Sequence, residues 1–194
     1  MLRPRLSLYG AASRDSGFSL IEAMITLTVL AVILVLGAPS LVAWTNNARV
    51  RTASQGLQDG LRLAQAEAVR RNRTVEFFLV DGQPALGSVS AANSRNWGVR
   101  AYPNPPAAPN ELIRVGVAGS TNDEVTVTGP RSVCFGPAGQ QITLAAINCA
   151  AAEQQFNVSS ARADRPLRVV VSIGGRVRMC DPARALAANV PEGC

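Results

Sequence analysis

The feature that most constrains this chain is a long apolar run with a single carboxylate near its start. After Glu22 no charged residue occurs until Arg49, and residues 23–48 are mostly aliphatic. About 20 apolar residues are enough for a helix to span a bilayer. Because a carboxylate in such a segment costs about 2.5–3.5 kcal/mol on insertion scales, an acid placed there is expected to have a function. The run therefore predicts a membrane helix with a functional acid at Glu22.

The residues around this acid resemble the start of a type IV prepilin, the precursor of a pilus or pseudopilus subunit. A short segment containing three arginines ends at Gly17, and Phe18 opens the apolar run. The resemblance implies that a prepilin peptidase cuts between Gly17 and Phe18 and methylates the new amine of Phe18. It also implies that Glu22 neutralises the terminal amine of a neighbouring subunit during assembly, an ion pair that is strengthened in dry surroundings.

An ordinary secretory signal is the alternative interpretation. Its apolar core would be residues 23–36, and cleavage near Ala38 or Ala43 would release a soluble secreted binding domain. The acid inside the apolar block and the Gly-Phe junction favour the prepilin interpretation. The two alternatives differ in the mature N-terminus, which is a methylated Phe18 in one case and a residue within 39–44 in the other.

Length and charge allow one membrane helix and one domain of ordinary size. Loss of a 17-residue leader from the 194 residues leaves 177. The predicted organisation is a leader at 1–17, a membrane and filament-core helix at 18–46, and a periplasmic domain at 47–194. All 19 basic residues are Arg, and the net charge of +6 falls to +4 because the leader carries three Arg and one Asp. A positive charge of this size permits an anionic partner without requiring one.

The fold class predicted from periodicity is α+β. Apolar residues recur every three or four positions from Val50 to Ala68, which predicts an amphipathic helix that continues to about residue 73. Pro39 lacks a backbone donor and is expected to kink this helix. From Val75 onward short strand-like runs alternate with Gly and Pro turns. The expected architecture is a long N-terminal helix packed on an antiparallel β-sheet or sandwich, as in pilins.

The predicted strands share β-prone residues and flanking turn signals. They are residues 75–80, 97–102, 111–117, 125–128, 131–135, 141–147, 156–159, 167–173 and 176–180. The stretches 82–96 and 103–110 are rich in Gly, Pro, Ala, Ser and Asn and are predicted to be mobile loops.

Four cysteines, Cys134, Cys149, Cys180 and Cys194, lie in the C-terminal third. An even number in an exported domain favours disulfides. Even the nearest two are separated by 13 residues, unlike the close pairs of zinc sites. Three pairings remain open, of which sequence proximity favours Cys134–Cys149 with Cys180–Cys194. No metal site is predicted.

Several segments of the mature chain resemble the FimT/GspH group of minor pilins and pseudopilins. They are Leu63-Ala-Gln-Ala-Glu-Ala-Val-Arg-Arg-Asn72, Trp97-Gly-Val-Arg100, Cys134-Phe-Gly-Pro-Ala-Gly139, Arg168-Val-Val-Val-Ser172 and Gly175-Arg-Val-Arg178. The resemblance implies a subunit of a type IV pilus, held in the inner membrane with its domain in the periplasm. The implied partners are other pilin or pseudopilin subunits, the prepilin peptidase and the inner-membrane assembly platform. A GspH-like pseudopilin of a type II secretion system is the alternative.

The residue inventory gives an enzymatic function little support. The chain contains no His, which excludes Ser-His-Asp and Cys-His catalytic machinery. It also contains no P-loop and no dinucleotide-binding glycine fingerprint. We therefore expect a structural or binding protein with no catalytic residues and no cofactor.

An arginine-rich segment near the C-terminus is the candidate binding site. Gly174 and Gly175 are predicted to form a hairpin turn, after which Arg176 and Arg178 point to one face because strand side chains alternate. Three upstream arginines could join the same patch through the hairpin: Arg162, Arg165 and Arg168. Forked guanidinium groups suit phosphate oxygens, so such a surface could bind double-stranded DNA without reading its sequence.

The run Gly175-Arg-Val-Arg178 also matches a Gly-Arg-x-Arg motif of FimT-like minor pilins. In that group the motif is associated with DNA binding during natural transformation, and the resemblance implies the same role here. The alternative is that alternating arginines keep an exposed hairpin soluble, or bind carboxylates of a neighbouring subunit.

Overall fold

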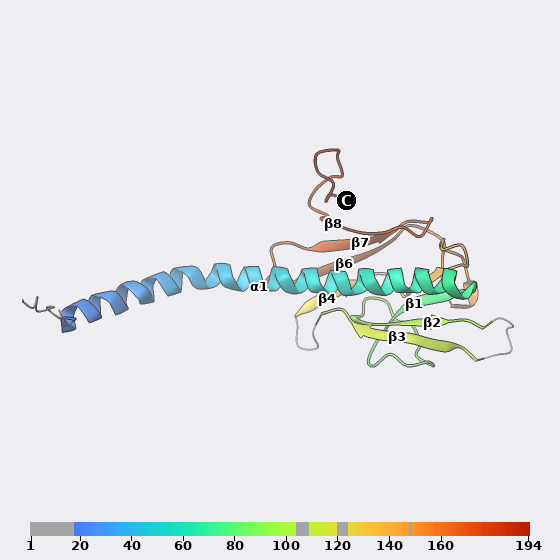
Figure 1. Cartoon of the computed structure of the whole chain (residues 1–194), viewed down its shortest axis with the longest axis horizontal. Coiled ribbons are helices and arrows are strands. Elements are labelled where there is room, and N and C mark those ends of the chain that lie inside the picture. Colours follow the sequence, from blue (N-terminus) through green and yellow to red (C-terminus); the bar gives the residue numbers. More distant parts are fainter. Residues whose placement is uncertain (1–17, 104–108, 120–123, 148) are drawn as a thin grey trace, which may run out of the picture. The chain divides into compact units, whose positions relative to one another are not determined.

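The computed structural model describes residues 18–103, 109–119, 124–147 and 149–194 (Figure 1). The predicted leader, including Gly17, lies outside the described residues. The chain divides into two compact units, Met1–Pro39 and Ser40–Cys194, which are described separately below.

One helix, α1, runs from Leu20 to Arg71. In the first unit the large apolar side chains that are described are exposed, and Glu22 lies in the first turn. Among the described residues, α1 is the one helix long and apolar enough to cross a membrane, as judged by length and composition alone. The helix continues through Pro39, whose side chain lies outside the described residues, so the predicted kink stays a prediction.

In the second unit the predicted apolar stripe of α1 is confirmed. Its members are fully buried: Val50, Ala53, Leu57, Leu61, Ala64 and Ala68. The helix stops where Asn72 adopts a positive φ of 51°, a left-handed conformation that commonly ends helices. Arg70 and Arg71 occupy the last turn, where cations offset the negative end of the helix dipole.

Eight strands form two antiparallel sheets of four strands each in the described part of the chain (Figure 1). The strands are β1 Val75–Val80, β2 Asn96–Ala101, β3 Glu111–Val117, β4 Val125–Thr128, β5 Ser132–Phe135, β6 Gln154–Ser160, β7 Leu167–Val171 and β8 Val177–Cys180. The first sheet has the order β3-β2-β1-β5 and the second β4-β6-β7-β8. One buried cluster joins α1 to both sheets, with Phe77 stacked on Trp97 and edge-on to Phe156. This α+β arrangement confirms the predicted fold class.

One of the nine predicted strands is wrong. Residues 141–147 form isolated bridges at Gln141 and Leu144 and then a short 3₁₀ helix, Ala145–Ile147. Leu144 pairs with Cys149, and Cys149 is joined to Cys134 of β5. The segment therefore folds back on itself beside β5 instead of extending along it, so tertiary context overrides its β propensity.

The loop between β1 and β2 is held by a buried polar cluster rather than left free. Glu76 is fully buried, and its Oε2 accepts hydrogen bonds from Arg100 Nε and from the Tyr102 hydroxyl, each at 2.6 Å. Arg100 also donates Nη1 to the Ser88 carbonyl at 3.0 Å and lies 4.5 Å from the ring centre of Phe78. Burial and the bond to Glu76 raise the pKa of Tyr102 above its ordinary value. This loop, for which the sequence predicts mobility, is thus tied to the first sheet.

The structure contains the two disulfides that sequence proximity favours, Cys134–Cys149 and Cys180–Cys194. The first lies buried beside β5. The second ties the C-terminal residue to the end of β8, where Asp181 pairs with Gly193 in a parallel bridge. The C-terminal tail therefore lies against the end of β8.

Candidate binding surface

The hairpin between β7 and β8 carries the Gly-Arg-Val-Arg run. Gly175 adopts a φ of 87°, which other residues rarely adopt, and its N–H donates to the Ser172 carbonyl at 2.8 Å. Ser172 N–H in turn donates to the Arg176 carbonyl at 3.0 Å. The predicted turn at Gly174 and Gly175 is therefore present, and Arg176 lies one residue before β8.

This turn is fixed from two sides. Gln141 is buried and donates Nε2 to the carbonyls of Val171 and Ser172, at 3.0 and 2.9 Å. Gly175 also lies against the Gly139 carbonyl so closely that an added Cβ would be 2.0 Å from its oxygen. The turn therefore holds Arg176 in a defined place on the domain.

The two arginines of the motif have different surroundings. Arg176 is exposed, whereas Arg178 is half-buried and donates Nη1 to the Gly193 carbonyl at 3.0 Å. Val177 between them is buried in the core, so both arginines project from the opposite, outer face of the second sheet. Met179, which the alternation places in the core, is only half-buried. One hydrogen-bond donor of the Arg178 guanidinium is therefore already engaged by the C-terminal tail.

The three upstream arginines do not form one cluster with Arg176. Arg162 and Arg165 lie in the turn before β7, while Arg176 follows its other end, and five residues of strand extend about 17 Å. Arg162 is also 3.5 Å from Glu124. Arg168 is on the outer face near Arg178 but donates Nε to Asn157 Oδ1 at 2.7 Å. Whether these arginines bind DNA stays a prediction.

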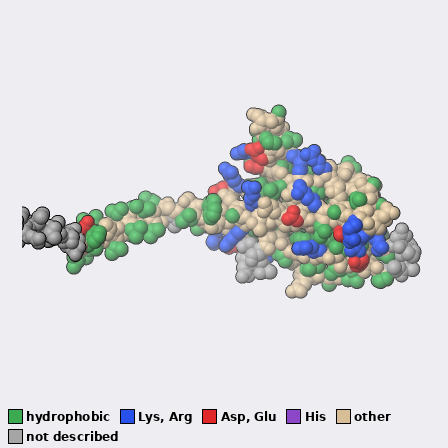
Figure 2. Space-filling view, in the orientation of Figure 1, with side chains coloured by type: hydrophobic (Ala, Val, Ile, Leu, Met, Phe, Trp, Pro, Cys, Tyr) green, Lys and Arg blue, Asp and Glu red, His purple; other side chains and the backbone are tan. Residues whose placement is uncertain are grey.

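Figure 2 shows that arginine side chains are more frequent than acidic ones on the visible face of the second unit. Part of this charge is neutralised along α1, where Glu67 binds Arg70 and Arg71 at 2.6 and 2.5 Å. These hydrogen bonds lower the pKa of Glu67. Arg71 also contacts Glu111 of β3, and the hydrogen bonds to the two carboxylates raise its pKa.

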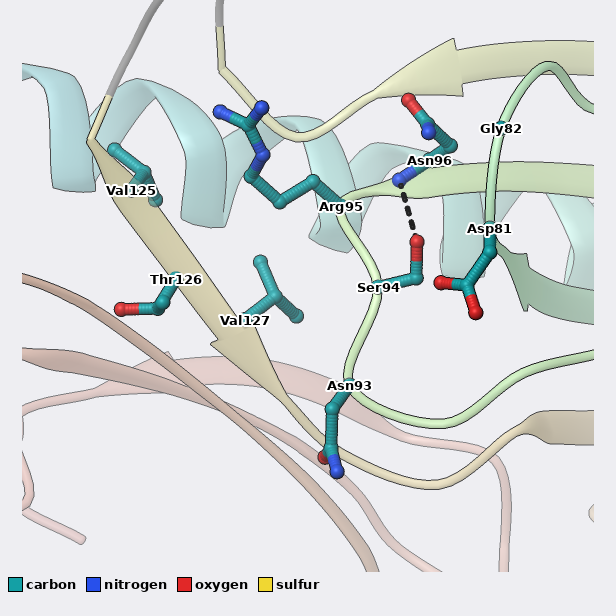
Figure 3. Close-up of a pocket in the computed structure, with 9 residues that line it drawn as sticks. All are labelled: Asp81, Gly82, Asn93, Ser94, Arg95, Asn96, Val125, Thr126 and Val127. Carbon is teal, nitrogen blue, oxygen red and sulfur yellow. Dashed lines mark hydrogen bonds between the residues drawn. The ribbon is translucent and has the colours of Figure 1, made fainter.

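A polar groove lies between the β1–β2 loop and β4 (Figure 3). Its polar groups largely serve the local backbone. Ser94 donates to the Val80 carbonyl at 2.5 Å, and Asn93 Oδ1 accepts from Gly129 N–H at 3.0 Å. Among the described residues no group of three or more His, Cys, Asp or Glu side chains is placed to hold a metal ion. The groove offers no recognisable catalytic arrangement.

Sequence reasoning did not find the residues that hold the hairpin in place. Gln65 on α1 donates Nε2 to the Gly139 carbonyl at 2.8 Å, and Arg62 reaches the Val177 carbonyl. These contacts join positions 74 and 115 residues apart, respectively. No local sequence pattern signals such a pairing.

A membrane-length N-terminal helix that continues into an α+β domain defines the class of pilin-like subunits. The family model described as "Type II transport protein GspH" matches residues 53–175, and that of the prokaryotic N-terminal methylation motif matches residues 12–38. The chain belongs to the GspH family of minor pilins and pseudopilins, whose members are structural subunits.

Two solved structures are similar to this chain. The type IV minor pilin FimU of Pseudomonas aeruginosa has a TM-score of 0.50 at 17% identity, covering 72% of this chain and 96% of its own. The minor pseudopilin EpsH of the type 2 secretion system of Vibrio cholerae has a TM-score of 0.48 at 9% identity, covering 70% and 99%. A search of curated protein sequences finds no match.

Proposed function

We propose that the protein is a FimT-like minor pilin that is incorporated into a type IV pilus and binds double-stranded DNA during natural transformation. The observation that carries this proposal is the exposed Arg176 on a turn fixed by Gln141 and Gly139. Because the backbone of this turn is already ordered, binding a phosphate has to order only the side chain of Arg176. Arg178, on the same outer face, supplies a second cation beside it.

Assembly is assigned to the N-terminal segment. The prepilin peptidase cleaves after Gly17, and the Phe18 amine of one subunit meets the Glu22 carboxylate of another as the filament grows. The apolar part of α1 holds the subunit in the inner membrane, with the second unit in the periplasm. The match to the N-terminal methylation motif over residues 12–38 supports this assignment.

A second candidate is a pseudopilin of a type II secretion system. The description of the matching family model, a type II transport protein, favours it specifically. In that case the second unit contacts other pseudopilins and exported proteins, and the arginines of the hairpin bind carboxylates of those partners instead of phosphates.

DNA binding by the full chain in a non-ionic detergent, measured across a salt series, tests the first proposal. We expect weak, sequence-tolerant binding that an Arg176→Ala/Arg178→Ala variant lacks. For each phosphate that a variant no longer neutralises, the slope of log K against log salt should flatten by about 0.9. Equal binding by the variant, or no binding by the parent, contradicts the DNA role and favours a purely assembly or secretion role.

A further inference from the structure

Helix α1 reaches the Gly-Arg-Val-Arg hairpin through an arginine of its own. Arg62 Nη2 lies 3.4 Å from the Val177 carbonyl oxygen. Val177 directly follows Arg176, so their Cα atoms are about 3.8 Å apart. The guanidinium of Arg62 therefore lies beside the start of β8, one residue from the arginine proposed to bind DNA.

Arg62 and Arg176 flank the same strand edge. β8 is the edge strand of the second sheet, and Val177 packs in the cluster that contains Leu61 and Ala64 of α1. Arg62 approaches this edge from the helix, while Arg176 projects from the outer face of the sheet. Both side chains are exposed, so both cations are accessible to a ligand at the start of β8.

The backbone segments that carry these two arginines are held together by contacts between α1 and the turn. Gln65 lies one helical turn after Arg62 and donates to the Gly139 carbonyl at 2.8 Å. The same carbonyl is in close contact with Gly175, which leaves no room for a side chain there. Helix and hairpin are thus coupled through one carbonyl group, which fixes the backbone of the turn that carries Arg176 relative to α1.

Arg62 also keeps most of its binding capacity. A guanidinium has five N–H donors, and the bond to Val177 is long at 3.4 Å. Arg70 and Arg71 on the same helix are instead committed to Glu67. Asp59 lies one turn before Arg62, and no ion pair joins the two among the described residues. Arg62 is therefore the α1 arginine best placed to act with the hairpin.

We infer that Arg62 and Arg176 bind the phosphate backbone of double-stranded DNA together, across the edge of β8. The inference rests on the proposed DNA-binding function. It extends the site from the hairpin to α1 and places it at the opposite end of β7 from Arg162 and Arg165. Phosphate oxygens are the ligand because guanidinium groups pair with them through several donors at once, without reading bases.

The test measures binding of a mixed-sequence DNA duplex to the full chain in a non-ionic detergent, at several salt concentrations. Arg62→Gln should flatten the log–log salt slope by about 0.9, as Arg176→Gln does, because each variant neutralises one phosphate fewer. Arg51→Gln, an exposed arginine elsewhere on α1, is the matched control and should keep the parent slope. Arg62→Lys should also keep the parent slope, because the cation remains. If Arg62 had only a structural role, the slope would not depend on whether residue 62 is charged.

The outcomes separate this inference from the proposed function. If Arg176→Gln flattens the slope but Arg62→Gln leaves it unchanged, the hairpin binds DNA alone and the inference is wrong. Weakened binding in Arg62→Gln that Arg62→Lys does not restore also overturns it, because the residue then acts through packing. If the parent does not bind the duplex, the proposed function and the inference both fail.

Discussion

At the scale of single residues, Arg100 of the first sheet makes several contacts that no local sequence pattern predicts. Its guanidinium lies over the ring of Phe78. It donates hydrogen bonds to the buried Glu76 carboxylate and to a carbonyl of the β1–β2 loop. One oxygen of the Glu76 carboxylate is buried without a hydrogen-bond partner among the described residues. Because an unpaired buried charge is far costlier than a paired one, the Glu76 carboxylate depends on Arg100.

Replacing Arg100 alone should therefore lower the free energy of unfolding strongly. Replacing Arg100 and Glu76 together should lower it by less than the sum of the two single replacements. We expect Arg100→Met to lower the free energy of unfolding by about 3–5 kcal/mol, since Glu76 is left buried without a counter-charge. Glu76→Gln/Arg100→Met should cost clearly less than the sum of the single variants. Urea unfolding of the parent, both single variants and the double variant gives the coupling energy. Additive costs would show that the two residues do not stabilise each other.

At the scale of elements, the C-terminal tail and β8 form one unit through Cys180–Cys194. Asp181 N–H donates to the Glu192 carbonyl of this tail, and the Asp181 carbonyl accepts from Cys194 N–H. Arg178 donates Nη1 to the Gly193 carbonyl of the tail. The bridge closes a short loop, with a sequence separation of 14. On the loop-entropy model such a bridge contributes about 3 kcal/mol.

Removing this bridge should release the tail and leave the core folded. We expect Cys180→Ser/Cys194→Ser to lower the free energy of unfolding by about 3 kcal/mol and to reduce amide protection across residues 182–194. Hydrogen exchange followed by mass spectrometry measures the protection, with the parent at the same pH as the reference. A tail as protected as in the parent would show that its backbone bonds suffice without the bridge.

At the scale of the whole molecule, local periodicity predicted the helix, eight strands and the fold class. The apolar stripe from Val50 to Ala68 and the turn at Gly174 are local patterns, so sequence alone located them. The error at residues 141–147 arose because their course depends on Leu144 pairing with Cys149 and on the bridge to β5. The pairing of Arg62 with the hairpin escaped prediction for a related reason, since 115 residues separate the contacting positions.

Both candidate functions require a chain that keeps its apolar helix after processing. In both, we expect the mature subunit to begin at Phe18, with its terminal amine and Glu22 available for assembly. Cleavage at a secretory site would instead remove the membrane helix and Glu22 with it.

The most direct test is mass spectrometry of the mature N-terminus of the chain isolated from cell membranes. We expect loss of the 17-residue leader and an N-methylated Phe18 as the first residue. A mature chain that begins within residues 39–44 would contradict both candidate functions, because such a product has lost the membrane helix and the assembly carboxylate.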